Sequence, residues 1–343
     1  MTGPILEVVE LSMPWPGLDP FIFTVHHVDH YPAGNEIQGP AASLAGRMLG
    51  SDFSYRDGWS MYHGTRVPGF PQHPHRGFET VTVVRRGFID HSDSLGATAR
   101  FGRGDTQWLT AGAGIQHSEM FPLLSATEPN ELELFQIWLN LPPRSKMVPP
   151  YFRMLWSEEI PTVVAEGGLV TIDVIAGELD GHHSPAGPPD SWASQPASDL
   201  QIWLIRLAPD ATWTLPAAAA GLNRVLHFFA GDDAAVGGQR IAKDTGVRLR
   251  GDASTLIRNH GEPAEFLLLG GRPIGAPVFQ MGPFVMNSPE EIAQAMVDYR
   301  TTAFGGWPWP TIEPVHERHR GRFAIHADGR LEERDQHLKE VEA

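Results

Sequence analysis

Short runs of β-branched and aromatic residues, separated by glycine and proline, make up most of this chain. The 36 glycines and 30 prolines are scattered along its 343 residues rather than gathered in one region. Runs of this kind are typical of strands that end in turns. Clear examples are Thr80–Val84, Leu132–Leu139, Val170–Ala176, Gln201–Leu207 and Ala264–Leu269. The pattern predicts an all-β sandwich or barrel with many turns.

Near the C-terminus, one segment is predicted to be a short helix. Ser288 can cap it, Pro289 suits its first position, and Glu291 completes a capping box. The apolar residues that follow have the spacing i, i+3, i+4 and i+7 and form one face: Ile292, Ala295, Met296 and Tyr299. We expect this helix to pack on a sheet as a structural element.

The segment from Asn35 to Pro71 does not have the strand pattern. It is longer than a connection between two strands requires. It contains four large side chains, those of Tyr55, Trp59, Met61 and Tyr62. Two interpretations are open. The segment is either a lid over a functional site or a surface loop with an aromatic cluster of its own.

The charge of the chain argues against nucleic acid as a partner. Lysine and arginine total 26, aspartate and glutamate total 41, and the net charge is −15. This charge repels phosphate backbones and anionic membranes, and no local basic cluster offsets it. We therefore expect no direct binding to nucleic acid or to membranes.

Cysteine is absent, which excludes a disulfide framework and thiol catalysis. This absence fits a reducing cytoplasm. The N-terminal segment Met1–Glu7 has no basic region followed by an apolar stretch, so no secretory signal is predicted. No run approaches the roughly 20 apolar residues of a membrane span. The expected location is the cytoplasm.

Two segments each place two metal-binding side chains two residues apart. His73 and His75 form one pair, and His117 and Glu119 form the other. Residues i and i+2 of an extended strand point to the same face, so each pair can converge on one point. Three imidazoles and a carboxylate suit one divalent ion of iron, manganese, nickel, copper or zinc.

The sequence around these pairs resembles the pirins, a branch of the cupin superfamily. The resemblance extends from about Asp29 to about Gly305, and relative to a pirin the segment Asn35–Pro71 looks like an insertion. Three segments carry it: His73–Thr80 (HPHRGFET), Asp105–Met120 (DTQWLTAGAGIQHSEM) and Gly282–Ile292 (GPFVMNSPEEI).

The resemblance implies two cupin-type β-barrels in tandem, a bicupin. The predicted divisions are a metal-binding domain over 1–143, a metal-free domain over 144–305 and a polar tail over 306–343. The second half has no ligand pair with strand spacing, because His182 and His183 are adjacent and would face opposite ways. Its other histidines, His227 and His260, are single. The tail histidines also lack paired spacing and are expected to be solvated. They are His316, His319, His326 and His337.

In pirins, the metal ligands are the two histidines of H-P-H and the histidine and glutamate of H-x-E. Matched residue by residue, this implies His73, His75, His117 and Glu119 here. The implied ion is Fe(II), with manganese, nickel, copper and zinc left open. Glu79 is an alternative to Glu119, because ordinary cupins bind the metal with a glutamate at this place in the first motif. We expect Glu119 to bind the metal and Glu79 to orient an imidazole.

Two further residues near these pairs are weaker candidates for a role at the metal site. His91 is expected at the surface or beside a ligand. Gln136 belongs to a predicted strand, but alternation alone leaves its direction open.

The resemblance implies a metal-dependent dioxygenase that cleaves a flavonol such as quercetin, or a similar aromatic enol, with O₂. Four protein ligands on a six-coordinate Fe(II) leave two positions, for the small aromatic substrate and for O₂. Glu119 is the candidate catalytic base for the substrate hydroxyl proton. Two other functions are open. A non-enzymatic iron or redox sensor would bind a protein partner, as the transcriptional cofactor role of some pirins implies. An isomerase or hydrolase would use the metal as a Lewis acid.

Overall fold

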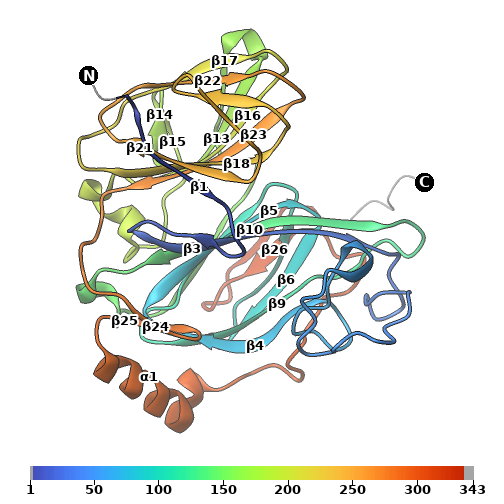
Figure 1. Ribbon diagram of the computed structural model, residues 1–343. Coiled ribbons are helices and arrows are strands. Elements are labelled where there is room, and N and C mark those ends of the chain that lie inside the picture. The colour runs from blue at the N-terminus through green and yellow to red at the C-terminus, as the bar shows by residue number, and fades with distance from the viewer. Residues whose placement is uncertain (1–2, 336–343) are drawn as a thin grey trace. The chain divides into compact units, whose positions relative to one another are not determined.

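The computed structural model describes residues 3–335, and these confirm the prediction of an all-β chain with one short α-helix near the C-terminus. The chain forms two compact units, each built from segments that are not consecutive in the sequence (Figure 1). Unit 1 comprises the described residues of Met1–Val25, Ile137–Pro142 and Glu158–Ala276. Unit 2 comprises the described residues of His26–Gln136, Pro143–Ser157 and Pro277–Ala343.

Unit 1 has two main sheets with a hydrophobic core between them. The larger has the order β1 (Ile5–Glu10), β21 (Thr245–Arg250), β18 (Asn223–Ala230), β23 (Ala264–Gly271), β16 (Gln201–Leu207), β13 (Val170–Ala176) and β12 (Thr162–Ala165). The smaller has the order β17 (Thr212–Leu215), β22 (Thr255–Asn259), β19 (Ala234–Val236) and β20 (Gln239–Ile241). The core contains Trp203 and Phe266 from the larger sheet and Trp213 and Ile257 from the smaller. A separate hairpin joins β14 (Glu178–Leu179) and β15 (His182–His183).

Unit 2 is built in the same way. One sheet has the order β27 (Leu331–Glu333), β26 (Phe323–Ile325), β7 (Thr98–Gly102), β6 (Phe88–Asp93), β9 (Ile115–Met120) and β4 (Gly69–His75). The other has the order β11 (Tyr151–Leu155), β8 (Thr106–Thr110), β5 (Phe78–Arg86), β10 (Asn130–Asn140), β3 (Phe21–Tyr31) and β2 (Trp15–Pro16). Of this sheet, β2 and parts of β3 and β10 belong to unit 1. The core between the sheets contains Phe101 and Ile115 from the first and Leu109 and Leu134 from the second.

The predicted helix is α1 (Pro289–Thr302). The Ser288 hydroxyl accepts a hydrogen bond from the backbone N of Glu291 at 3.2 Å, as a cap should. The Glu291 carboxylate accepts from the backbone N of Asn287 at 2.7 Å, one residue before the position that a capping box would use. The helix packs on the hairpin of β24 (Phe279–Met281) and β25 (Phe284–Met286). The buried contacts are Phe284, Met286, Ile292 and Ala295.

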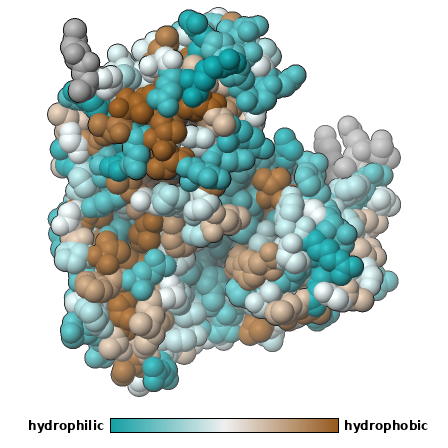
Figure 2. Space-filling model, viewed as in Figure 1, coloured by the Kyte–Doolittle hydropathy of each residue, from teal (hydrophilic) through white to brown (hydrophobic). Residues whose placement is uncertain are grey.

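Residues 3–335 contain six short 3₁₀ helices, all in connecting segments. They are η1 (Arg56–Gly58), η2 (Pro143–Ser145), η3 (Glu166–Gly168), η4 (Trp192–Ser194), η5 (Pro196–Ser198) and η6 (Ala303–Gly305). Among residues 3–335, no helix combines the length and the hydrophobicity that crossing a membrane requires. Hydrophobic residues gather on the face of unit 1 around β1 (Figure 2), where Leu6 is 61% exposed.

The two units interleave along the chain, whereas the predicted divisions 1–143, 144–305 and 306–343 follow one another. The segment 306–335 is not a polar tail, because β26 pairs with β7 and buries Phe323 and Ala324. Such a three-residue strand, surrounded by charged residues, carries too little pattern to be read from the sequence. Residues 336–343 of the predicted tail lie outside the described residues.

The histidines of this last segment follow the expectation only in part. His319 is exposed, as predicted. The backbone N of His316 instead donates to the Asp90 carboxylate at 2.7 Å, and Nε2 of His326 lies 2.8 Å from the Glu332 carboxylate. Both rings are partly buried. The fourth histidine, His337, lies outside the described residues.

The long segment between β3 and β4 packs into the core of unit 2. Trp59, Met61 and Tyr62 are buried there, while Tyr55 is half exposed. The ring of Tyr62 stacks on that of Phe70, with centroids 5.3 Å apart. These aromatic residues therefore extend the core rather than form a separate surface cluster. That the segment acts as a lid stays a prediction.

Candidate metal centre

Two neighbouring strands bring three histidines together in unit 2. In the antiparallel pair of β4 and β9, His73 lies directly opposite His117. Residues opposite one another in such a pair point to the same face, and His75 follows two residues after His73 on that face. The ring centroids are 4.4 Å apart for His73 and His117, 4.8 Å for His75 and His117, and 4.7 Å for His73 and His75. One potential ligand atom from each histidine lies within 4.8 Å of the other two.

The surroundings keep these imidazoles neutral, as a metal ligand must be. Burial lowers the pKa of His73 to about 4. Burial, together with the neighbouring imidazoles, also holds the pKa values of His75 and His117 well below the usual histidine range. A protonated cluster of three histidines is therefore disfavoured at neutral pH.

The hydrogen bonding of the cluster fits a metal ion. Neither ring nitrogen of His117 has a hydrogen-bond partner among the described residues, although the ring is fully buried. Buried polar atoms normally have partners, so His117 has bonding capacity that a metal would use. In His73, Nδ1 lies 2.8 Å from the carbonyl of Pro71. A carbonyl can only accept, so Nδ1 carries the proton and Nε2 keeps its lone pair.

Glu119 lies beside the histidines, on the same strand as His117. Its Oε2 is 3.9 Å from Nε2 of His117 and accepts a hydrogen bond from the Gln136 amide at 2.7 Å. The Thr82 hydroxyl lies 3.0 Å from the other carboxylate oxygen and 2.7 Å from Oε1 of Gln136, so its one proton can serve only one of them at a time. Burial raises the pKa of Glu119. The direction of Gln136, which alternation left open, is toward this carboxylate.

Glu79 lies on β5, after the chain has turned. Gly77, with φ at +84°, separates β4 from β5, so the spacing from His75 does not run along one strand. Within β5, Glu79 and Thr82 are three residues apart and point to opposite faces. The Thr110 hydroxyl donates to the Glu79 carboxylate at 2.7 Å. Glu79 therefore does not share one continuous strand with His75, and this geometry favours Glu119.

His91 lies opposite Glu119 in the pair of β6 and β9 and is fully buried, so a place at the surface is excluded. Its ring is 5.5 Å from that of His117 and stacks on Phe152 at 5.1 Å. Its Nε2 lies 3.2 Å from the Asp93 carboxylate. His91 is therefore a fourth buried imidazole, next to His117 and opposite Glu119.

Thr82 is the residue near the carboxylate that the sequence did not single out. It belongs to the predicted strand Thr80–Val84, and alternation places Thr82 on the same face as Val84, which lies in the core of unit 2. A polar residue on a core-facing position was the available signal.

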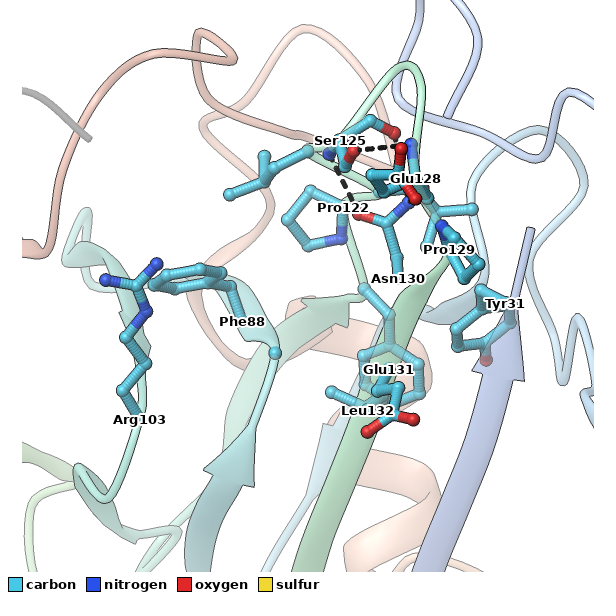
Figure 3. A pocket seen from close by; sticks show the side chains of 14 residues that line it. Tyr31, Phe88, Arg103, Pro122, Ser125, Glu128, Pro129, Asn130, Glu131 and Leu132 are labelled. Atoms are coloured by element: carbon cyan, nitrogen blue, oxygen red, sulfur yellow. Dashed lines mark hydrogen bonds between the residues drawn. The ribbon is translucent and has the colours of Figure 1, made fainter. Parts of the chain in front are cut away.

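The three-histidine cluster does not coincide with the cavity in Figure 3. This cavity has a volume of about 190 Å³ and is lined by none of the three histidines.

Comparisons with protein-family models, with related sequences and with solved structures agree with one another. Two family models match, the one described as Pirin over residues 35–139 and the one described as the Pirin C-terminal cupin domain over residues 202–305. Human pirin is 37% identical over 252 residues, which are 71% of this chain and 80% of that protein. A pirin-like protein of Caulobacter vibrioides is 37% identical over 271 residues, or 77% of this chain and 90% of its own. A crystal structure of quercetin 2,3-dioxygenase from Acinetobacter baumannii has a TM-score of 0.71 at 26% identity, covering 89% of this chain and 99% of that one.

Proposed function

This chain belongs to the pirin family, and on that premise we propose that it is a metal-dependent dioxygenase that cleaves a flavonol such as quercetin, or a similar aromatic enol, with O₂. The prediction of two cupin domains is confirmed by the two family models and by the structural neighbour. The observation that carries the proposal is the convergence of His73, His75 and His117 beside a buried carboxylate.

His73, His75, His117 and Glu119 would hold the ion, for which we propose Fe(II). A bound iron ion would supply redox chemistry toward O₂ and open positions for small ligands. The Pro71 carbonyl orients the His73 ring, and burial keeps all three imidazoles neutral.

Glu119 is the proposed base for the hydroxyl proton of the substrate. Burial raises the pKa of its carboxyl group. A higher pKa makes the carboxylate a better proton acceptor near neutral pH. The Gln136 amide donates to the carboxylate at 2.7 Å, and the Thr82 hydroxyl, 3.0 Å away, can donate to it in place of its bond to Gln136. These two residues would keep the carboxylate in position while it exchanges a proton with the substrate.

The test begins with elemental analysis of protein purified without a histidine tag. The metal-free protein is then loaded anaerobically with Fe(II) or with Zn²⁺, and O₂ uptake is recorded with quercetin and a panel of flavonols and catechols. We expect uptake only with iron and substrate together, because Zn²⁺ has no accessible redox change.

Two outcomes would contradict the proposal. Equal turnover of a substrate by the zinc and iron forms would support Lewis-acid isomerase or hydrolase chemistry. No O₂ uptake by protein shown to hold Fe(II), together with metal-dependent capture of a protein partner, would support the sensor function.

A further inference from the structure

Gln116 precedes the proposed ligand His117 on β9, and its side chain lies on the opposite face of that strand from the metal cluster. It is nevertheless buried, with only 1% of its surface exposed. The cover comes from α1 and η6, which belong to unit 2, as β9 does. A buried amide needs partners for its two N–H donors and for its carbonyl oxygen, so these partners hold the covering segment in place.

The side chain of Gln116 makes four hydrogen bonds, which satisfy its amide group. Its Nε2 donates to the carbonyls of Ala303 at 2.6 Å and of Gly306 at 3.0 Å. Its Oε1 accepts from the Tyr299 hydroxyl at 3.1 Å and from Nε2 of Gln72 at 2.7 Å. Three of these four bonds therefore join β9 to the end of α1 and to η6, and the fourth joins β9 to β4.

Phe304 of η6 covers the turn that leads into β9. A Cβ atom at Gly114 in this turn would lie 2.6 Å from the Phe304 ring, so only glycine leaves room for the ring. The guanidinium of Arg76, the residue that follows His75, lies 4.6 Å from the centroid of the same ring. Arg76 also donates to the Asp298 carboxylate of α1 at 2.7 Å. The end of β4 and the start of β9 are thus both in contact with α1 and η6.

These contacts include a chain neighbour of each histidine in the metal cluster. The neighbours are Gln72 before His73, Arg76 after His75 and Gln116 before His117. Adjacent residues share a planar peptide unit, so a backbone shift at one of them also moves the other. The positions of the three imidazoles therefore depend on contacts on the outer face of β4 and β9. A metal ion tolerates only small changes in these positions.

We propose that Gln116 is a positioning residue, which couples docking of the α1–η6 segment, Ser288–Gly306, on the outer face of β9 to metal binding on the inner face. The proposal rests on the metal site of the proposed function. Release of the α1–η6 segment removes three partners of Gln116 and leaves β9 free to shift. The docked state binds the metal more tightly than the released state. Because such coupling is reciprocal, a bound metal stabilises the docked α1–η6 segment by the same factor.

The first measurement is the affinity of the full-length protein for Co²⁺, obtained without O₂ by competition with a chelator. Gln116→Met keeps the length of the side chain but removes its four hydrogen bonds. It should lower the affinity about tenfold and change the visible absorption spectrum of the bound ion. Tyr299→Phe removes one of these bonds and should have a smaller effect. Thr301→Val is the control, because Thr301 is exposed on the same helix and its hydroxyl bonds within α1, to the carbonyl of Val297.

The second measurement is amide hydrogen exchange of the α1–η6 segment, with and without saturating Co²⁺. In the wild type, the metal should slow this exchange about tenfold, the same factor as the change in affinity. In Gln116→Met, the metal should have little effect on the exchange. A residue with only a structural role would instead speed up the exchange equally with and without the metal.

Phe304→Ala keeps the test decisive if Gln116→Met does not fold. It removes the ring over Gly114 without a change in β9, and should produce both effects. Unchanged Co²⁺ affinity in the variants, an equal loss in Thr301→Val, or exchange in the wild type that does not respond to Co²⁺ would overturn the proposal. Absence of O₂ uptake with the coupling intact would count against the dioxygenase function alone. Failure of the wild type to bind Co²⁺ would overturn both.

Discussion

At the scale of single residues, the Pro71 carbonyl determines how His73 can act. Because it accepts from Nδ1, only Nε2 of His73 is available to a metal. His117 is free to use either nitrogen, since neither has a partner among the described residues. The chain therefore fixes the tautomer of His73, whereas a ligand could select the tautomer of His117.

Replacing His75 with alanine should reduce the affinity for Fe(II) by at least about 10–100-fold while leaving the β-sheets intact. The reason is that His75 supplies one of the three converging imidazoles. Metal content after dialysis measures the effect, and circular dichroism checks the fold. His63→Ala is a suitable control because His63 is exposed and lies outside the cluster. Full metal occupancy in the His75 variant would remove it from the ligand set.

The two glutamates can be separated by matched amide substitutions. Glu119→Gln should weaken metal binding more than Glu79→Gln, because Glu119 lies 3.9 Å from His117 and supplies negative charge. Glu79 instead accepts from Thr110 on the other face of β5. Calorimetric titration with a divalent ion measures both variants. Loss of binding only in the Glu79 variant would assign the ligand role to Glu79.

These residues also show what the sequence can and cannot supply. The spacing of His73, His75 and His117 is local, and strand alternation is enough to predict that they share a face. The position of Glu79 depends on where one strand ends, at Gly77, which a count of residues ignores. The contact of Thr82 with Glu119 depends on how separate strands pair, and no local pattern contains that information.

At the scale of elements, the segment between β3 and β4 is anchored by a buried carboxylate. Asp29 accepts hydrogen bonds from the Tyr62 hydroxyl at 2.7 Å and from the backbone N of Ser60 at 2.9 Å. Nδ1 of His27 lies 2.9 Å from the same hydroxyl. Burial raises the pKa of Asp29 from 3.8 to about 6. This anchor should therefore respond to mildly acidic pH.

Asp29 should make the protein less stable as the pH rises from about 4 to about 6. In this range the unfolded chain has released the proton and the folded protein retains it, so stability falls with pH. The size of the effect is on the order of 2–3 kcal/mol. Asp29→Asn should flatten this part of the profile, measured by urea unfolding at each pH. Asp57→Asn, at a 69% exposed side chain of the same segment, should leave it unchanged. An identical slope in the Asp29 variant and the wild type would contradict the prediction.

At the scale of the whole molecule, the net charge of −15 limits the partners. Non-specific affinity for DNA comes mostly from phosphate contacts that release counterions, and a negatively charged protein gains little from them. We expect no binding to an arbitrary duplex at micromolar protein and about 150 mM salt, as measured by fluorescence anisotropy. Affinity in the micromolar range or tighter that decreases with added salt would show a basic surface that the overall charge conceals.

The fold class and the single helix were predictable because both depend on patterns within a few residues. The arrangement into units was not, because it depends on which distant segments pair. α1, for example, lies within the predicted second domain, 144–305, but belongs with unit 2. The segment that contains β26 joins unit 2 through the pairing of β26 with β7, which lies more than 200 residues earlier.

The interleaved order of the segments has a consequence for synthesis on the ribosome. A growing chain usually completes its N-terminal domain first. Here the last segment of unit 1 ends at Ala276, while unit 2, which includes most of the first half of the chain, still lacks the segment that begins at Pro277. Until β26 leaves the exit tunnel, β7 has one unpaired edge. Unit 2 is therefore the later of the two units to be completed, although most of its residues are translated first.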